Sequence, residues 1–376
     1  MRRREFLASV ALAPVFLQAA QTADETGFVA LFDGTSLDGW TVADGPESAF
    51  YVSDGAILAH QSAGFPTWLR SAKQYENFEF RGEFFVNGWM NSGIYLHAPE
   101  HGRNIWCGMK INIFHQVDRN PSPESMGSVF PLVPPLKVNV KNKGQWNTFR
   151  ILMDWPQLRV WTNEELIQDL NVETVPELRY RLRSGYLGLE SLSYPIRFRA
   201  LRVRELPSKV SWTALYEGAE DFAKWHVSDG KPIFQALGGV LHGDGDGHFA
   251  TNDSFRDFEL QMYVRHVRHH NGGVVFRGAS PGRRPYEVQL HDVEGAHYPT
   301  GSLYSFKRAE LYPRIEPERW WLFQMRVKDA TCVVRVNGDT VLEYDKLENL
   351  SAGPIALQAH DTGRWTEYKH ILVRPI

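Results

Sequence analysis

The sequence lacks the features of disulfide-rich, membrane-spanning and disordered proteins. Only two cysteines, Cys107 and Cys332, occur in 376 residues, and they fall in different halves of the chain, which excludes a disulfide scaffold. No apolar run beyond Leu17 is long enough to cross a membrane. No charge run or low-complexity tract indicates disorder. The chain is instead long enough to build two hydrophobic cores.

The N-terminus has the pattern of an export signal. Three arginines at positions 2–4 precede a short apolar run at 8–17, and the segment Arg3-Arg4-Glu5-Phe6-Leu7 resembles a bacterial twin-arginine signal. We therefore expect residues 1–23 to form a signal peptide that is cleaved near positions 20–23. This predicts a periplasmic or extracellular protein.

The charge balance excludes one class of partner. Removal of residues 1–23 takes away three arginines and one glutamate, leaving 38 basic and 43 acidic residues and a net charge of −5 in place of −3. An acidic chain without a basic stripe matches the nucleic-acid backbone poorly, so no nucleic-acid partner is expected. Aromatic residues reach 13%, with 12 tryptophans, which suits both β-sheet cores and stacking on sugars.

The chain contains one internal repeat at a spacing of about 170 to 185 residues. The segment 31–34 (LFDG) leading to Trp40 corresponds to 215–218 (LYEG) leading to Trp225. Further pairs follow in the same order, namely 77–80 with 257–260, 91–94 with 271–274, and 127–130 with 301–304. The conserved order predicts two homologous domains, 27–206 and 211–376.

Both copies have the pattern of β-strands. In the second copy, Phe258, Leu260, Met262 and Val264 alternate with other residues, which is typical of a half-buried strand. Asn337-Gly338 between two apolar runs predicts a tight hairpin. Helical periodicity is not evident after the N-terminal segment. We therefore predict an all-β protein with antiparallel sheets packed as sandwiches, each able to leave one curved face open for a ligand.

Six motifs together resemble the 3-keto-disaccharide hydrolase domain family. They are 31–40 (LFDGTSLDGW), 91–96 (NSGIYL), 144–149 (GQWNTF), 286–292 (YEVQLHD), 301–304 (GSLY) and 353–360 (GPIALQAH). The resemblance covers both halves of the chain. It implies two tandem concanavalin-A-like jelly-roll domains and, for some members, cleavage of glycosides that carry a ketone at sugar C3.

The implied reaction defines the groups that an active site would need. A ketone at C3 acidifies the C2 hydrogen, so a base can remove it while the C1 substituent leaves, and water then adds to the unsaturated sugar. Such a site requires a general base and a group that stabilises the enolate oxygen. An acid for the leaving oxygen would complete it.

The segment 286–292 holds the strongest candidates for these roles. On a strand, Glu287, Gln289 and His291 project to one face, with Asp292 at the strand end, as on an open binding face or an ordinary solvated face. The spacing resembles the Glu-x-Asp-x-x-Glu strand of related glucanases, but Gln289 replaces the central acid, which argues against hydrolysis by two carboxylates. We expect Glu287 to be catalytic and Gln289 and Asp292 to bind sugar hydroxyls.

Other candidates come from the neighbouring motifs. Arg277 is expected to stabilise the enolate, with a surface ion pair as the alternative. His360 is expected to act as base in place of Glu287, or as an acid, because histidine titrates near neutral pH. Gln358, Tyr304 and Lys307 are expected to contact the substrate.

Two histidine-containing runs have the residue types of metal sites. Arg268-His269-His270 lies beside a predicted turn and is interpreted as a solvated loop, because adjacent strand residues point to opposite faces. His242, Asp244, Asp246 and His248 alternate with glycines and fit either a Ca²⁺ site or a flexible glycine-rich loop. No metal ligand or cofactor is predicted, and a requirement for a divalent metal stays open.

The first copy departs from the candidate site. Its residues at the corresponding positions are Lys110, Asn112 and His115 for Glu287, Gln289 and Asp292, His97 for Arg277, and Leu192 for His360. We expect this domain to bind glycan or to support the second domain. A different site built on His97, His115 and Glu190 is the alternative.

Three functions are compatible with the sequence. The leading hypothesis is an exported enzyme that cleaves 3-keto-glycosides through its second domain, with a carbohydrate as its partner. The second is a non-catalytic tandem glycan-binding protein, since the same fold serves lectins. The third is a structural module at the cell surface, which predicts that Glu287, Gln289, Arg277 and His360 do not converge. The sequence does not determine the oligomeric state.

Overall fold

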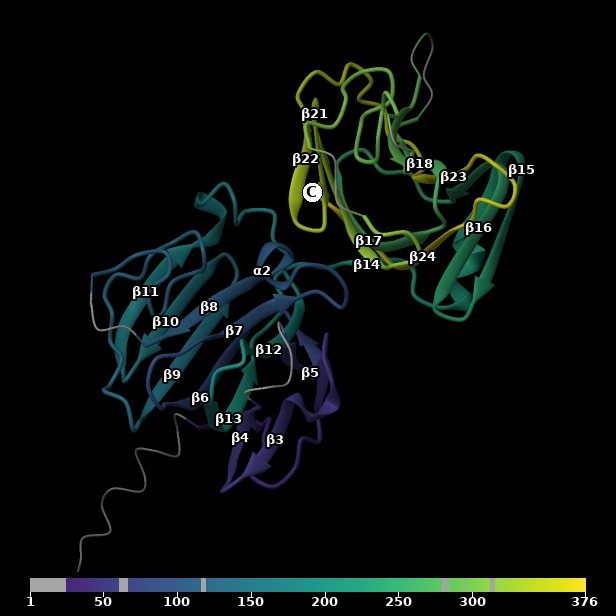
Figure 1. Cartoon of the computed structure of the whole chain (residues 1–376). Helices are drawn as coiled ribbons and strands as arrows, with labels where there is room; N and C mark the ends of the chain where they lie inside the picture. Colours follow the sequence, from purple (N-terminus) through teal and green to yellow (C-terminus); the bar gives the residue numbers. More distant parts are fainter. Residues whose placement is uncertain are drawn as a thin grey trace, which may run out of the picture.

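The computed structural model describes residues 25–60, 67–115, 120–278, 282, 284–293, 295–311 and 315–376. The predicted export signal at 1–23 lies outside these residues. Among the described residues, no helix has the length and apolar character needed to cross a membrane. The chain folds into two β-sandwiches that lie side by side (Figure 1), which confirms the predicted all-β class.

The first sandwich is built from two sheets. One sheet has the strand order β11-β10-β9-β6-β13-β4-β3, with β1 paired to β13, and the other has the order β2-β5-β12-β7-β8. A short helix, α2 (Asn104–Cys107), connects β7 to β8. The strands are β1 (Val29–Ala30), β2 (Trp40–Ala43), β3 (Phe50–Ser53), β4 (Ala56–Ala59), β5 (Thr67–Tyr75), β6 (Phe78–Val86), β7 (Asn91–Ala98), β8 (Met109–Phe114), β9 (Gln145–Asp154), β10 (Gln157–Thr162), β11 (Glu165–Asn171), β12 (Gly185–Ser191) and β13 (Ile196–Glu205).

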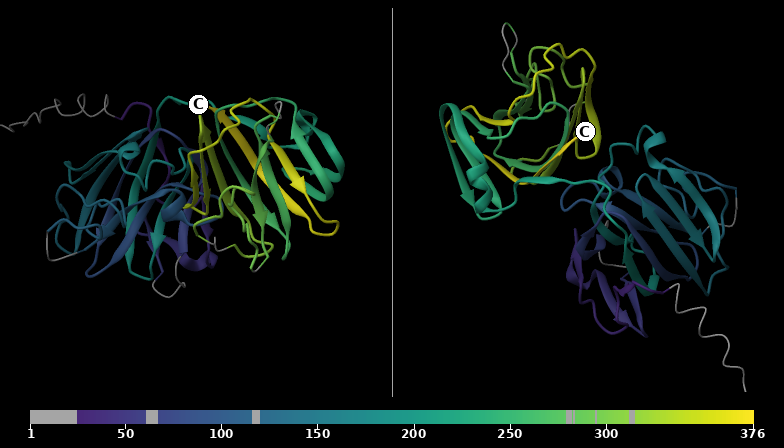
Figure 2. Two further views of the ribbon diagram at one scale, coloured as in Figure 1. Left: turned by 90° about the horizontal axis from the view of Figure 1, so that it is seen from above. Right: turned by 180° about the vertical axis from the view of Figure 1, so that it is seen from behind.

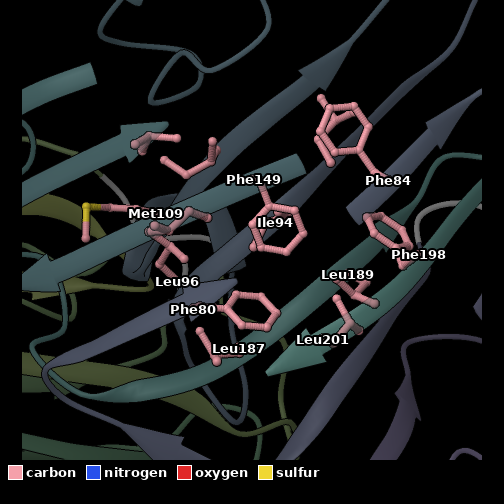
Figure 3. Packing of buried hydrophobic residues seen from close by; sticks show 14 of the residues in the cluster. Phe80, Phe84, Ile94, Leu96, Met109, Phe149, Leu187, Leu189, Phe198 and Leu201 are labelled. Carbon is pink, nitrogen blue, oxygen red and sulfur yellow. The ribbon is translucent and has the colours of Figure 1, made fainter. Parts of the chain in front are cut away.

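Alternate side chains from the two sheets fill the first core. Phe80 and Phe84 point inward from β6, while Ile94 and Leu96 point inward from β7, and all four are at most 1% exposed. Figure 3 shows them packed with Met109 and other apolar residues of the same cluster. Because successive strand residues face opposite sides, the intervening residues of β7, β8 and β12 point to the outer face.

The second sandwich is one continuous sheet folded into two layers. Its strand order is β19-β18-β23-β16-β24-β17-β20-β21-β22, with β14 paired to β24 and β15 paired to β16. The strands are β14 (Thr213–Tyr216), β15 (Trp225–Leu237), β16 (Val240–Thr251), β17 (Phe258–His266), β18 (Asn271–Phe276), β19 (Tyr286–His291), β20 (Trp321–Lys328), β21 (Thr331–Val336), β22 (Asp339–Tyr344), β23 (Ala356–Ala359) and β24 (Thr366–Pro375). Short 3-10 turns lie at Glu47–Ala49, Val172–Thr174 and Ala219–Lys224.

Strand β16 joins the two layers. Its first part, Leu241 to Gly243, pairs with β24, whereas its second part, Gly247 to Ala250, pairs with β23. Between them, Gly245 and Gly247 have φ of +91° and +139°, which L-residues with side chains rarely adopt, so glycine allows the strand to bend there. The glycine-rich run is therefore an ordered strand, and its interpretation as a flexible loop is wrong.

Arg268 and His269 lie exposed in a turn, as the interpretation of a solvated loop predicts, but His270 of the same run does not. His270 is 1% exposed, its ring stacks 5.1 Å from that of His266, and burial lowers its pKa to about 3. It is therefore a neutral, buried side chain. Among the described residues, no group of three or more histidine, cysteine, aspartate or glutamate side chains could hold a metal ion.

The two sandwiches contact each other through one layer of the second. Cys107 and Leu182 of the first sandwich form a buried cluster with Tyr263 and Leu322 of the second. The backbone N–H of Glu100 donates to Tyr263 Oη at 2.7 Å. Figure 1 shows β17 and β24 on the side of the first sandwich and β18 and β23 on the far side, and Figure 2 gives two further views of this arrangement.

Candidate functional site

The outer face of the layer β16-β23-β18-β19 carries polar side chains in neighbouring rows. Because residues two positions apart on a strand share a face, the cross-strand pairs define which side chains lie together. Three rows on this face are Asn271–His291, His248–Gln358–Gly273–Gln289 and Ala250–Ala356–Val275–Glu287. The face lies on the opposite layer from the one that contacts the first sandwich.

A cavity of about 480 Å³ opens over these rows. This volume falls within the range of small-molecule sites. Five of the eight residues predicted for the site line it, namely Glu287, Gln289, Tyr304, Gln358 and His360, together with Asn271, His291, His297 and Tyr298. The hypothesis of a structural module at the cell surface predicts that these polar residues do not converge. Glu287, Gln289 and His360 do line one cavity, which disagrees with it.

Glu287 is held over a glycine at the floor of this polar cavity. A Cβ atom at Gly273 would lie 2.3 Å from Glu287 Oε1, so the missing side chain provides the space for the carboxylate. Gln289 Nε2 donates a hydrogen bond of 2.7 Å to the same oxygen. Burial raises the pKa of Glu287 above its ordinary value, while the charges of His248 and His360 oppose the shift. A carboxylate with a raised pKa is a stronger base, as proton abstraction requires.

Two amide side chains in the polar cavity have unused hydrogen-bonding capacity. Within the described residues, neither Asn271 Oδ1 nor Gln358 Oε1 has a hydrogen-bond partner, although both atoms are buried. Buried polar atoms in native proteins are usually paired with protein, water or ligand. Both oxygens are therefore available to accept hydrogen bonds from the hydroxyl groups of a bound sugar.

Tyr304 forms one wall beside Glu287. The segment 301–304 pairs with the edge of β19, where the Tyr304 N–H donates to the Glu287 carbonyl oxygen at 2.9 Å and the Gly301 N–H to that of Gln289 at 2.8 Å. The Tyr304 side chain is 49% exposed, and its ring lies 5.4 Å from that of Tyr298. An exposed aromatic face next to polar groups is suited to stacking against a sugar ring.

Arg277 does not present its guanidinium to a ligand. Arg277 directly follows β18 and has a φ of 67°. Its side chain is 0% exposed, and Nη2 donates to Asp257 Oδ1 at 3.2 Å and to the Asp329 carbonyl oxygen at 2.8 Å. His97, the corresponding residue of the first sandwich, has a φ of 52° and is likewise buried, with Nε2 2.7 Å from the Glu76 carbonyl oxygen. The expected role of Arg277 in stabilising an enolate is corrected to a structural one.

Two further predicted residues lie away from the polar cavity. Lys307 Nζ donates to Glu310 Oε1 at 2.6 Å and to the Glu343 carbonyl oxygen at 2.9 Å, so its charge is already paired. Asp292 follows β19, where its backbone N–H donates to the His270 carbonyl oxygen at 3.0 Å, and it is not among the residues that line the cavity. Neither residue lines the polar cavity, where the expected contacts with substrate would be made.

A second cavity adjoins the first and contains residues that the sequence analysis did not assign. It has a volume of about 630 Å³ and shares Glu287, Tyr304 and Gln358 with the polar cavity. Its wall includes His248, whose Nδ1 lies 2.7 Å from Asp229 Oδ1. The alternation of His248 with glycines, taken as a strand pattern, could have placed it on this face. No pattern marks His297 and Tyr298, which come from a loop.

The first sandwich has the same frame with the corresponding space filled. Lys110, at the position of Glu287, forms an ion pair of 2.6 Å with Glu190, which stands at the position of Gln358, and both are 2% exposed. Tyr95 Oη donates to the other oxygen of Glu190 at 2.5 Å, and the Lys110 ammonium lies 4.5 Å from the centre of the Phe130 ring. Lys110 and Glu190 therefore satisfy each other's charge without any ligand.

A second correspondence links Trp68 with His248. Both residues pair across the sheet with the position held by Glu190 or Gln358. Trp68 Nε1 donates to Asp44 Oδ2 at 2.9 Å, as His248 Nδ1 lies close to Asp229. The aspartate is thus present in both sandwiches, but the first sandwich has the Trp68 indole, 3% exposed, where the second has the His248 imidazole. His97 is buried and its pKa is lowered to about 4, so it offers no accessible imidazole to the alternative site, whereas His115 of that site is partly exposed.

The fold and the site together define a class of protein. Antiparallel sandwiches with a polar cavity and aromatic walls on one outer face are typical of carbohydrate-binding and carbohydrate-cleaving proteins. The sequence profile of the 3-keto-alpha-glucoside-1,2-lyase-like domain matches residues 27–204 and again residues 211–374. The chain therefore belongs to this family, with two tandem copies of the domain.

Characterised and solved relatives are similar to parts of the chain. A 3-keto-disaccharide hydrolase of Bacteroides thetaiotaomicron is 22% identical over 231 residues, which are 49% of this chain and 80% of that protein. A candidate glycosyl hydrolase of Parabacteroides distasonis has a TM-score of 0.43 and 18% identity, covering 51% of this chain and 98% of its own. The carbohydrate-binding module CBM66 of Bacillus subtilis has a TM-score of 0.34 and 9% identity, covering 44% and 96%.

Proposed function

We propose that the second sandwich cleaves 3-keto-glycosides and that Glu287 is the base that removes the C2 proton. The family match and the name of the Bacteroides thetaiotaomicron relative support the substrate class. The observation that carries the assignment is the partly buried carboxylate of Glu287, held over Gly273 in a cavity with several hydrogen-bonding groups. The first sandwich has a lysine at this position and is proposed to support the second.

The reaction proceeds by elimination and readdition of water. Glu287 takes the C2 proton, and the electron pair of that bond moves toward the C3 oxygen to form an enolate. The enolate then collapses, a C1–C2 double bond forms, and the C1–O bond breaks with its electrons on the leaving oxygen, which takes up a proton. Water adds its oxygen to C1 and a proton to C2, releasing the 3-keto sugar.

The neighbouring side chains fit the other steps of this reaction. Asn271, Gln358 and His360 line the polar cavity and are assigned to bind the C3 oxygen and the sugar hydroxyls, where a donor stabilises the developing negative charge. His248 stands beside Gln358 on the neighbouring strand, with Asp229 behind it. An imidazole oriented by a carboxylate is suited to protonate the leaving oxygen.

The test replaces the base by its neutral isostere. Glu287→Gln retains the shape and should lower kcat for release of the aglycone from a 3-keto-glucoside by about 10²- to 10⁴-fold. Exchange of the C2 hydrogen with deuterated water should fall in parallel, because it reports the same proton transfer. Glu310→Gln serves as the matched control, since that carboxylate is 60% exposed and pairs with Lys307 outside the cavity.

The outcome also separates catalysis from binding. The unused acceptors Asn271 Oδ1 and Gln358 Oε1 favour a glycan-binding protein as the second candidate function. Saturable binding of the 3-keto-glucoside to the unmodified protein without aglycone release would establish that second function. Undiminished release by Glu287→Gln would remove Glu287 from the mechanism.

A further inference from the structure

Two cavities of different character meet at Glu287. The polar cavity holds His360 and the two amides assigned to the sugar, whereas the second cavity of about 630 Å³ extends from the shared residues Glu287, Tyr304 and Gln358 along other walls. A glycoside cleaved beside Glu287 has its sugar on one side of the scissile bond and its aglycone on the other. The second cavity therefore lies where the aglycone would extend.

The walls of the second cavity are largely apolar. They include Val275, Pro285, Phe306, Pro354 and Ala356. Phe306 is 51% exposed, and its ring packs at 5.0 Å from that of Tyr286, which holds it at the cavity. Large apolar side chains that line a concave surface and remain exposed are typical of ligand-binding sites.

We infer that this second cavity binds the aglycone and that the preferred substrates are 3-keto-glycosides with a flat, apolar, aromatic aglycone. The inference rests on the proposed function, because it takes Glu287 as the point of cleavage. Aromatic rings of a ligand pack favourably against Phe306 and Tyr304, whereas those hydroxyls of a second sugar that lie against Val275 and Pro354 would lack partners. Arg284, Ser228 and Asp229 also line this cavity and provide partners for polar substituents of the ring.

The experiment compares two substrates that share the sugar and differ in the aglycone. An aryl 3-keto-α-glucoside and methyl 3-keto-α-glucoside are turned over by the unmodified protein and by Phe306→Ala, and kcat/KM is measured for each. We expect Phe306→Ala to lower kcat/KM about 10-fold for the aryl substrate and to change it less than about 2-fold for the methyl substrate. Trp89→Ala, which removes a 64% exposed aromatic side chain from the first sandwich, is the matched control and should change neither value.

The contrary outcomes separate this inference from the proposed function. Equal effects of Phe306→Ala on the two substrates, or no effect on either, would overturn the aglycone assignment while leaving the function intact. If the unmodified protein releases no aglycone, the proposed function fails, and calorimetric binding of the same two glycosides then decides the inference. Weaker binding of the aryl glycoside alone to Phe306→Ala would still support the cavity assignment, and unchanged binding would refute it.

Discussion

The two sandwiches share one frame and differ in what occupies its outer face. In both, an aspartate lies within hydrogen-bonding distance of a ring nitrogen: Asp44 with Trp68 in the first and Asp229 with His248 in the second. In both, a glycine also lies beneath a long side chain: Gly93 beneath Lys110 and Gly273 beneath Glu287. The first sandwich closes this face with a buried ion pair, whereas the second leaves a cavity. The difference shows that a few side chains on a retained backbone decide between a filled face and an open site.

The energetic roles of the corresponding side chains should also be opposite. Lys110 and Glu190 are both buried, so loss of either partner leaves an uncompensated charge. Glu287 has a neutral partner, Gln289, and a pKa raised by burial, so its ionisation costs stability in the folded state. The first sandwich thus uses its charges for stability, and the second retains a charge that chemistry requires.

Replacement of Lys110 should have the largest effect on stability. Lys110→Ala should destabilise the first sandwich by about 3–5 kcal/mol, because Glu190 then remains buried without its partner. Glu287→Gln, at the corresponding position, should change the unfolding free energy of the second sandwich by less than about 1 kcal/mol. Denaturant unfolding followed by tryptophan fluorescence measures both. Equal losses in the two variants would contradict the contrast.

The paired glycines should separate activity from stability. In Gly273→Ala the new methyl group would displace the Glu287 carboxylate, and we expect kcat for 3-keto-glucoside cleavage to fall about 10- to 100-fold with little change in melting temperature. In Gly93→Ala the methyl group would meet Lys110 Cδ at 2.7 Å, and the effect should fall on melting temperature instead. Loss of activity in Gly93→Ala with Gly273→Ala unaffected would reverse the assignment of the two faces.

The contact between the sandwiches should respond weakly to pH. Hydrogen bonds to Glu100 and Glu217 raise the pKa of His370 to about 9, and those from His101 and His370 lower the pKa of Glu100. His370 therefore contributes stability that is fully present below its ordinary pKa of 6.5 and is lost as the pH rises to about 9, while the contribution of Glu100 is lost as the pH falls below about 4.5.

Small-angle scattering and melting temperature across pH 5 to about 9.5 test this linkage. The unmodified protein should lose stability or become less compact toward the alkaline end of this range. His370→Gln should flatten that dependence, and a pH dependence unchanged by the substitution would exclude His370 as its source. This effect should be the smallest of those considered, since the His370 side chain is 40% exposed.

The sequence predicts the fold well because its signals are local and occur twice. Period-two alternation specifies the strands, and the ordered motifs identify the duplication and the family. The same alternation places Glu287 and Gln289 on one face. Continued past β18, the same alternation would place Arg277 on that face too. Instead, the positive φ of Arg277 directs its side chain to a buried hydrogen bond with Asp257, which residue spacing cannot predict.

Other parts of the site depend on contacts between distant segments. From the sequence alone, the run that contains His248 fits either a Ca²⁺ site or a flexible glycine-rich loop, because the bend of β16 between two layers is visible only in the pairing of that strand. Tyr298 and His297 come from a loop with no periodic pattern, and their position depends on segment 301–304 pairing along β19. In the first sandwich, the corresponding face is occupied by the Lys110–Glu190 ion pair. These two residues are 80 positions apart in sequence, so no local pattern predicts their contact.

The bend in β16 also determines how cooperatively the second sandwich unfolds. Since that strand is hydrogen-bonded to β24 in one layer and to β23 in the other, the ladder runs without a break from the edge that carries Glu287 to the edge formed by β22. Within the described residues, the corresponding strands of the first sandwich, β4 and β5, belong to two separate sheets. Amide protons on both layers of the second sandwich should therefore become exposed in one concerted opening, so the cavity wall shares the cooperativity of the whole domain.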